Sequence, residues 1–288
     1  MILEQCCGVI ASVAPFSADH PLVVGLCDSP DRPERVVFVE NFPQEQSVSL
    51  SERATLRNGV WIHIITIDAY LGSAGAFLRG IELAKEKGGR MVVLFDQDCQ
   101  VDSKTCKELF RHCTATSPIV VGNRNARGEG LVTPGLFLAI KKTPTRRTDT
   151  LATWAGMAFD LNLVPKWREW LMTLSRTLWF YWDDYVFCSW AMADGMTIRS
   201  IPTARFYSPN PPRRNRTGWR YYYEARNAVW FARLTMPTGR RTHFITLWFL
   251  EFVVGFGLRD RKFGWAWMGF WHGVKGVYGR VYGPSASD

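Results

Sequence analysis

The chain has 288 residues, of which 47% are hydrophobic and 21% charged, so it is a folded globular protein and global disorder is excluded. Its formal net charge is +9, and the excess lies in the last third: residues 199–288 hold 15 basic and 4 acidic residues, whereas residues 1–198 carry a net −2. Cations interleaved with aromatic residues indicate a phosphate-rich partner, a nucleic acid or an anionic membrane surface, with a solvated basic face as the plain alternative.

Short apolar runs alternate with helical patterns in the first half of the chain, which predicts an α/β fold with a mostly parallel sheet. The predicted strands span residues 8–14, 35–40, 62–67, 91–95, 119–121 and 136–140. The predicted helices span residues 77–87, 104–113, 163–170 and 189–193. A Pro/Arg-rich loop over 208–218 then precedes aromatic helical segments. We therefore predict an α/β domain over residues 1–207 and a helical, basic and aromatic region over 208–288.

Two carboxylates one residue apart, Asp96 and Asp98, follow the apolar run 91–95. This spacing predicts that both lie at the carboxyl edge of the sheet, where α/β proteins bind ligands. Hard oxygen ligands at that edge suit Mg²⁺ or Mn²⁺ bridging a diphosphate. The alternative is that both residues simply cap the next helix.

Two reaction classes use such a pair of carboxylates. Sugar-nucleotide transferases hold the donor diphosphate through it, whereas phosphatases of the haloacid-dehalogenase type use the first Asp as a nucleophile. The second class normally places the pair near the start of the chain, with Thr or Val two residues beyond it. Here Gln100 stands in that place.

A second acidic pair, Asp183 and Asp184, follows Trp182 and the apolar stretch 178–181. A carboxylate beside aromatic side chains can have its protonation tuned, as a general base requires. A helix start with an acidic first turn is the common alternative.

The order of these motifs resembles the family-2 inverting nucleotide-sugar glycosyltransferases of the GT-A fold. The similarity covers most of residues 8–230, and the segments that carry it are 36–41, 72–80, 96–98, 154–156, 182–184 and 221–227. Segments 72–80 and 182–184 are most similar to galactofuranosyltransferases. Segments 96–98 and 223–227 are equally similar to bacterial rhamnosyltransferases of polysaccharide assembly.

The resemblance implies a donor site and an acceptor site. It implies that Glu40 reads the base, that the glycine loop 72–80 approaches the nucleotide, and that Asp96 and Asp98 face the ribose and the metal. It implies Asp184 as the catalytic base and Asp183 beside it near the acceptor. The implied donor residues are Glu40, Gly72, Gly75, Arg79, Asp96 and Asp98, and the implied acceptor residues are Trp154, Ala155, Gly156 and Trp182.

Three positions depart from the family pattern. The first strand ends in residues 12–15 rather than Thr-x-Asn, Tyr70 stands where an Asn commonly precedes the glycine loop, and residues 198–209 contain no His. The absent His leaves Mn²⁺ or Mg²⁺ to Asp98, Asp96 and the diphosphate.

The resemblance predicts an enzyme that transfers a sugar, with galactofuranose or rhamnose favoured, from a UDP- or dTDP-sugar. The acceptor is a hydroxyl of a cell-surface polysaccharide or lipid-linked glycan. A metal-dependent phosphatase leaves segments 182–184 and 221–227 without a role, and a nucleic-acid-binding protein leaves both acidic pairs unexplained, so we expect no nucleic acid partner.

The apolar run 244–258, followed by Arg259, Arg261 and Lys262 and then by three Trp residues, predicts attachment to an anionic bilayer. It contains Glu251 and two glycines and is too short to cross a membrane, and no signal peptide is evident. The expected location is the cytoplasm, on the inner face of the cell membrane. Helices packed into the core are the alternative.

Overall fold

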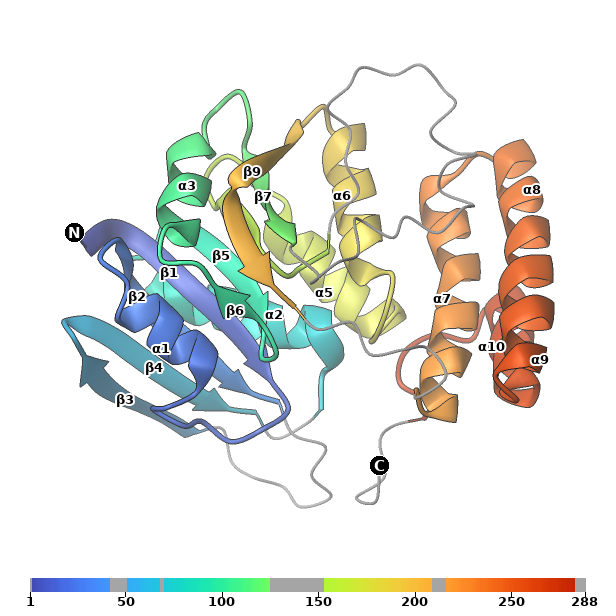
Figure 1. Ribbon diagram of the computed structural model, residues 1–288. Helices are drawn as coiled ribbons and strands as arrows, with labels where there is room; N and C mark the ends of the chain where they lie inside the picture. Colours follow the sequence, from blue (N-terminus) through green and yellow to red (C-terminus); the bar gives the residue numbers. More distant parts are fainter. Residues whose placement is uncertain (1, 42–50, 68–69, 125–152, 209–215, 283–288) are drawn as a thin grey trace.

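A computed structural model describes residues 2–41, 51–67, 70–124, 153–208 and 216–282, and the structural statements below concern these residues (Figure 1). A twisted sheet with helices on both faces occupies one end of the molecule, and a group of helices from the C-terminal part occupies the other. The strand predicted at 136–140 lies outside the described residues.

Four parallel strands form the first half of the sheet. They occur in the order β4-β2-β1-β5, and each is a short run of buried aliphatic residues, as strands covered on both faces require. Their bounds are β1 Ile2–Ser12, β2 Arg32–Glu40, β4 Val60–Thr66 and β5 Met91–Asp96. The predicted strands 8–14, 35–40, 62–67 and 91–95 are therefore confirmed.

The second half makes the sheet mixed rather than mostly parallel. Strand β8 (Met157–Asp160) runs antiparallel to both of its neighbours, β5 and β7 (Ile119–Arg124), and β9 (Ile198–Tyr207) then pairs parallel with β7. The short strands at the two edges, β3 (Ser51–Arg57) and β6 (Gln100–Val101), are also antiparallel to their neighbours. The prediction of a mostly parallel sheet therefore holds for the first half, whereas in the second half β7 and β9 are the one parallel pair among the described strands.

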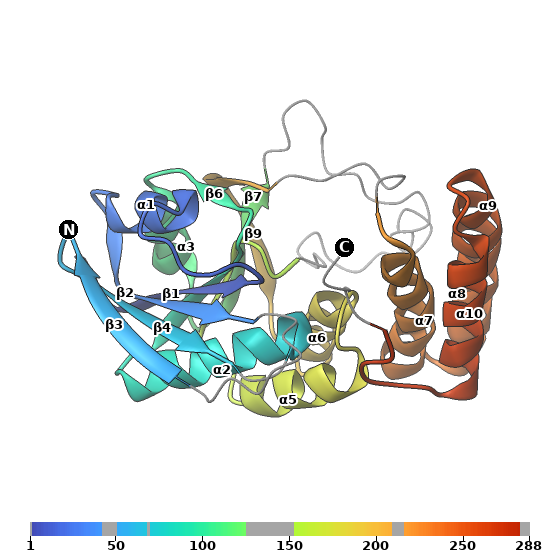
Figure 2. The ribbon, with the colours of Figure 1, turned by 90° about the horizontal axis from the view of Figure 1, so that it is seen from below.

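Helices cover both faces of the sheet (Figure 2). One face packs against α2 (Gly72–Glu86), α5 (Trp167–Thr177) and α6 (Asp183–Ala193). The other packs against α1 (Pro21–Cys27) and α3 (Thr105–His112). Helix α2 begins earlier than predicted because buried packing outweighs the poor helix propensity of its glycines. Helix α6 also begins earlier, with Asp183 and Asp184 in its first turn, where acidic residues favour a helix.

The C-terminal helices share the core of the α/β part. They are α7 Gly218–Thr235, α8 Thr238–Trp248, the π-helical η2 Phe249–Phe256, α9 Gly257–Arg259 and α10 Phe263–Lys275. Phe231, Phe244 and Trp248 pack around Trp182, which precedes α6. One core thus crosses residue 207, and the division into two domains stays a prediction. None of the helices in the described ranges is long and apolar enough to span a bilayer.

Candidate active site

Polar side chains line the carboxyl edge of the parallel strands. The register pairs Ser12 with Glu40 and Glu40 with Thr66, and it pairs Ala11 with Asp96. Successive strands are added on one side of β1 and then, with β5, on the other, so this edge contains the topological switch point where α/β sheets bind ligands. The predicted position of Asp96 at this edge is confirmed.

Gln97 fixes the turn between the two carboxylates of the first pair. Its side-chain oxygen accepts hydrogen bonds from the hydroxyl of Ser12 and the backbone N–H of Val13, both at 2.7 Å. Its own N–H donates to the carbonyl of Ala11 at 3.1 Å. Asp96 and Asp98 therefore belong to a turn that is tied to the end of β1. This role of Gln97 could not be predicted from the sequence, because a lone Gln has many uses.

Asp183 is buried and held by two donors from distant parts of the chain. Its Oδ2 accepts from the hydroxyl of Ser73 at 2.5 Å and from the indole N–H of Trp154 at 3.0 Å. Burial raises the pKa of the Asp183 carboxyl, and these two hydrogen bonds oppose the rise. Asp183 thus joins α6 to α2 and to the turn before β8.

Asp184, the predicted base, is half-buried in the first turn of α6. Burial raises the pKa of its carboxyl well above the ordinary value, and the charges of Asp183 and Asp96 raise it further. The backbone N–H of Tyr185, 2.8 Å from Asp184 Oδ1, opposes the rise. Trp154, which donates to Asp183, lies two residues before Gly156, whose N–H donates to the carbonyl of Leu94 in β5 at 2.8 Å. This brings the start of α6 to the end of the strand that carries Asp96, although the two acidic pairs are far apart in the sequence.

The backbone before this pair has an unusual conformation. Trp179, Tyr181 and Trp182 have φ angles of 65°, 64° and 69°, in the left-handed region that side chains other than glycine rarely adopt. Each such residue costs about 1–3 kcal/mol, and such strain is concentrated at functional sites. This conformation could not be predicted from the sequence, because Trp and Tyr are rarely found in left-handed turns.

Glu40 lies at the same edge but already has partners within the protein. Its carboxylate accepts from the N–H of Phe16 at 2.9 Å and from Arg53 at 2.6 Å, and also from the hydroxyl of Thr66. The side chain is almost fully buried. Its contact with a nucleotide base stays a prediction.

The glycine segment is the first half of α2 rather than a loop before a helix. An added Cβ at Gly72 would overlap the carbonyl oxygen of Trp179, and one at Gly80 would overlap side chains of β1 and β2. An added Cβ at Gly75 would overlap the side chain of Leu71 and would contact that of Ser175. These glycines are therefore explained by close packing within the protein, and the donor-binding roles of Gly72 and Gly75 stay predictions.

Arg79 lies further along α2 on an exposed surface. Its guanidinium pairs with Glu82 at 3.2 Å, and the other oxygen of Glu82 accepts from Arg168 of α5 at 2.8 Å. Arg79 therefore belongs to an ion-pair network between α2 and α5, and its contact with a donor phosphate stays a prediction.

The residues predicted to contact the acceptor are mostly structural in this fold. Trp154 and Trp182 are 3% and 5% exposed, so neither offers a ring face to a ligand. Trp154 donates to Asp183, and Trp182 donates to the carbonyl of Glu224 in α7 at 3.1 Å. Ala155 is buried too. Gly156 has a φ of 73°, and an added Cβ there would overlap the ring of Phe206. Acceptor contact by these residues stays a prediction.

Asp96 and Asp98 are the two carboxylates at this edge that could hold a divalent cation. Both lie beside Cys99, whose thiol is 4.0 Å from Asp98 Oδ1 and whose N–H donates to the carbonyl of Asp96 at 3.0 Å. Pairing of β6 with β9 brings the end of β9 to the same place. Within the described ranges, no three His, Cys, Asp or Glu side chains converge as a metal site. Two carboxylates suit Mg²⁺ or Mn²⁺, whose other ligands are commonly substrate phosphates and water.

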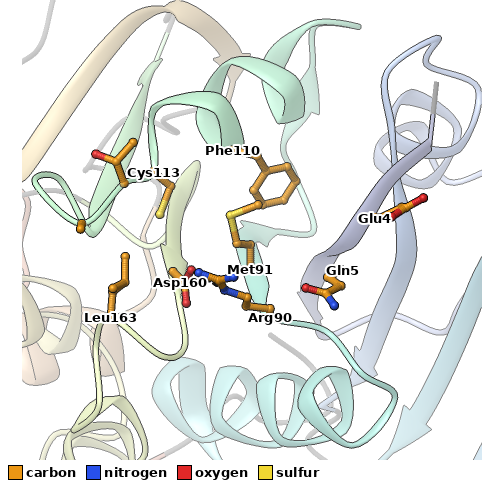
Figure 3. A pocket seen from close by; sticks show the side chains of 10 residues that line it. Glu4, Gln5, Arg90, Met91, Phe110, Cys113, Asp160 and Leu163 are labelled. Atoms are coloured by element: carbon orange, nitrogen blue, oxygen red, sulfur yellow. Dashed lines mark hydrogen bonds and ion pairs between the residues drawn. The ribbon is translucent and has the colours of Figure 1, made fainter.

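A separate hollow of about 290 Å³ lies at the opposite, amino-terminal edge of the parallel strands (Figure 3). Gln5 and Met91, near the starts of β1 and β5, line it together with Cys113. Arg90 and Asp160 in its wall pair with each other at 2.8 Å. The hollow contains none of the predicted site residues, so we assign it no part in the chemistry.

Comparison with known proteins gives a match to one family model. Residues 21–162 match the family model described as glycosyl transferase family 2. The match covers just under half of the chain and includes the first acidic pair, whereas Asp183 and Asp184 lie beyond it. No curated protein matches the chain.

Several solved structures have a similar fold. TarS 1-349 from S. aureus aligns with 94% of this chain and 81% of its own at 14% identity, with a TM-score of 0.54. Its complex with UDP-GlcNAc aligns with 94% of this chain and 82% of its own at 13% identity, with a TM-score of 0.55. The mannosyltransferase PcManGT from Pyrobaculum calidifontis, in complex with GDP-Man and Mn²⁺, aligns with 94% of this chain and 75% of its own at 13% identity, with a TM-score of 0.53. At these identities the likeness establishes the fold, a GT-A-like α/β architecture with a mixed sheet.

Proposed function

Because the chain carries a glycosyl transferase family 2 domain, we propose that it transfers a sugar, with inversion, from a nucleoside diphosphate donor to a hydroxyl group. The observation that carries this proposal is the convergence of the two acidic pairs at the carboxyl edge of the sheet. Asp96 is the last residue of β5 and Asp184 lies in the first turn of α6, and Trp154, which holds Asp183, lies two residues before Gly156, whose N–H donates to the carbonyl of Leu94 in β5. A donor-side carboxylate and a base next to each other are what a single displacement requires.

The donor binds, in this proposal, outside the ends of β1 and β5. Asp96 and Asp98 would hold Mn²⁺ or Mg²⁺, which would supply positive charge to the departing diphosphate when bound. The complexes of two similar structures with UDP-GlcNAc and with GDP-Man and Mn²⁺ favour a nucleotide-sugar donor. The turn fixed by Gln97 keeps the two carboxylates in place without rearrangement.

Asp184 removes the proton of the acceptor hydroxyl as the new glycosidic bond forms, while the bond to the diphosphate oxygen breaks on the opposite face of the sugar. The pKa of the Asp184 carboxyl is raised, and a carboxylate with a higher pKa accepts a proton more readily. Asp183, held by Ser73 and Trp154, keeps the first turn of α6 in position.

The sugar is proposed as galactofuranose or rhamnose, carried by UDP or dTDP, on sequence resemblance alone. Segments 72–80 and 223–227, which carry much of that resemblance, pack within the protein and so describe the scaffold of the site. The proposed acceptor is a hydroxyl of a cell-surface polysaccharide or of a lipid-linked glycan.

The test is a panel of UDP-, dTDP- and GDP-sugars supplied with Mn²⁺ and candidate glycan acceptors, with release of nucleoside diphosphate as the readout. Release that depends on both donor and acceptor supports the proposal. Release of phosphate from simple esters without an acceptor would instead favour a phosphatase, in which Asp184 has no role.

Asp98→Ala is expected to remove the metal-dependent part of nucleotide binding. The affinity for UDP or dTDP in Mn²⁺ should fall by roughly tenfold or more, because a charged metal ligand is lost, while the weaker affinity measured in EDTA is unchanged. Calorimetric titration measures both. Asp102→Ala, which removes a nearby exposed carboxylate between β6 and α3, is the matched control. Equal Mn²⁺ dependence in Asp98→Ala and wild type would exclude Asp98 from the metal site.

We also propose that the C-terminal helices bind an anionic membrane surface. Rings of η2 and α10 contact one another, and two of them are well exposed, Trp267 at 39% and Trp271 at 41%. We call Phe249, Phe263, Trp267, Phe270 and Trp271 the aromatic patch. The exposed cations Arg259, Arg261 and Lys275 lie at the ends of α9 and α10. Exposed Trp beside cations suits the boundary between lipid headgroups and acyl chains, and the proposed location is the inner face of the cell membrane.

Vesicle co-sedimentation tests this surface. The protein should pellet with anionic vesicles at low salt, dissociate as the salt concentration rises, and not bind neutral vesicles. The double variant Trp267→Ala/Trp271→Ala should bind anionic vesicles roughly tenfold or more weakly, because it buries less apolar area in the bilayer. Trp61→Ala removes a comparably exposed Trp from β4 and should bind as wild type does. Equal pelleting of the double variant and wild type would contradict the proposal.

A further inference from the structure

The segment 178–182, which leads into the acidic pair of α6, has a backbone that regular secondary structure does not satisfy. Trp179, Tyr181 and Trp182 are left-handed, so successive carbonyls point in different directions and need donors from elsewhere. Those donors come from two neighbouring residues of α7. The amide of Asn227 donates to the carbonyls of Leu178 at 2.9 Å, Phe180 at 2.5 Å and Tyr181 at 3.2 Å.

Arg226 makes the same segment rigid from beside Asn227. One terminal nitrogen donates to the carbonyl of Leu178 at 2.7 Å, and the other donates to the carbonyl of Gly279 at 2.6 Å. Its Nε donates to Oδ1 of Asn227 at 2.8 Å. Because a guanidinium N–H can only donate, its partner must be the amide oxygen, and this orients the amide nitrogen of Asn227 toward the carbonyls.

Both residues are fully buried, and the guanidinium lies 4.6 Å from the ring centre of Tyr223. Gly279, the second partner of Arg226, donates its own N–H to the carbonyl of Thr177 at 2.9 Å. The opposite side of the segment is closed by Gly72, which touches the carbonyl of Trp179. Segment 178–182 is thus held between the start of α2, the middle of α7 and the residues after α10.

We propose that Arg226 and Asn227 are positioning residues: they hold the carbonyls of segment 178–182 so that the first turn of α6, which carries Asp184, keeps its position. This inference rests on the proposed function for its catalytic consequence. Neither residue touches the reacting atoms, so their effect reaches the reaction through the position of Asp184. Misplacement of a catalytic group by about 1 Å can cost on the order of a hundredfold in rate.

The test compares Asn227→Asp and Arg226→Lys with Arg233→Lys. Asn227→Asp keeps the shape and the acceptor of Arg226 but loses the N–H donors. Arg226→Lys keeps the charge and loses the fork that orients Asn227. Arg233 is the matched control, because it lies two turns along the same helix and donates to the carbonyls of Gly273 and Val274 in α10.

We expect Asn227→Asp and Arg226→Lys to lower kcat by roughly 10- to 100-fold with a donor KM within about twofold of wild type, at temperatures where melting curves show both variants folded. Hydrogen exchange of the amides in 178–185 should rise in both, and Arg233→Lys should change neither quantity. If Asn227→Asp does not fold, Arg226→Lys alone decides.

Two results separate this inference from the proposed function. Unchanged exchange in 178–185, or wild-type kcat in folded Arg226→Lys, overturns the positioning role even if the wild-type protein transfers sugar. If the wild type transfers no sugar, the proposed function fails, while raised exchange confined to 178–185 still supports the hold of Arg226 and Asn227 on the segment.

Discussion

Asp184→Asn is expected to reduce sugar transfer by about 10²–10⁴-fold, the usual worth of general-base catalysis, and to leave donor affinity nearly unchanged. The amide keeps the shape of the carboxyl and cannot take up the acceptor proton. Asp96 and Asp98, which bind the donor in our account, are not altered. Turnover with the identified donor, together with calorimetric titration of the nucleotide, measures both quantities.

The matched control is Asp183→Asn. The carboxylate of Asp183 accepts from Ser73 and Trp154 through one oxygen, and the amide oxygen of Asn can accept both bonds. This variant should keep most of the activity. A dead Asp183→Asn beside an Asp184→Asn that retains more than a few per cent of turnover would reverse the assignment.

The raised pKa of Asp184 predicts the direction of two further effects, one on stability and one on the pH dependence of transfer. Burial and the charges of Asp183 and Asp96 raise the pKa of the Asp184 carboxyl in the folded protein above its value in the unfolded chain. The stability that Asp184 contributes is therefore present at low pH and is lost as the pH rises through the raised pKa. Asp184→Asn should therefore melt at a higher temperature than wild type at neutral pH. Transfer by wild type should fall as the pH drops through the same pKa, because the base becomes protonated.

Gly72→Ala is expected to destabilise the protein by more than about 4 kcal/mol, or to prevent folding. Gly72 has a φ of 72°, and an added Cβ would overlap the carbonyl oxygen of Trp179. Relief requires movement of the Trp179 peptide group, which the hydrogen bonds around it oppose. Urea unfolding measures the loss.

Gly195→Ala is the control for Gly72→Ala. Gly195 has a φ of 83°, but no atom lies within 4 Å of its added Cβ, so the cost is the left-handed conformation alone, about 1–2 kcal/mol. Equal losses in the two variants would mean that contact with Trp179 does not matter. A folded Gly72→Ala with weak nucleotide affinity would restore Gly72 to the donor site.

The sequence predicted the elements whose signal is local. The buried run before Asp96 ends in a strand at the expected place, and the carboxylate lies at the carboxyl edge because parallel strands end there together. The antiparallel insertion of β8 was not predicted, since a short apolar strand carries no mark of its direction. The α/β fold and the parallel strands of its first half were therefore predicted, whereas the mixed pairing of the whole sheet was not.

The acceptor residues show why the rest of the site was beyond reach. The resemblance implies Trp154 and Trp182 as acceptor residues, and in the fold each indole N–H donates to a partner distant in the chain and each ring is buried. Nothing in a sequence distinguishes a Trp that lines a site from one that supports it. Gln97, Ser73 and Asn227 were missed for the same reason, because their partners come together only in the folded chain.

Release of nucleoside diphosphate from the nucleotide-sugar panel, measured in Mn²⁺ with and without a glycan acceptor, tests the central claim most directly. Our account predicts release from at least one donor that requires the acceptor, is abolished by Asp184→Asn and is retained by Asp183→Asn. Release that does not need Asp184, or no release from any nucleotide sugar in the panel with polysaccharide and lipid-linked acceptors present, would contradict it.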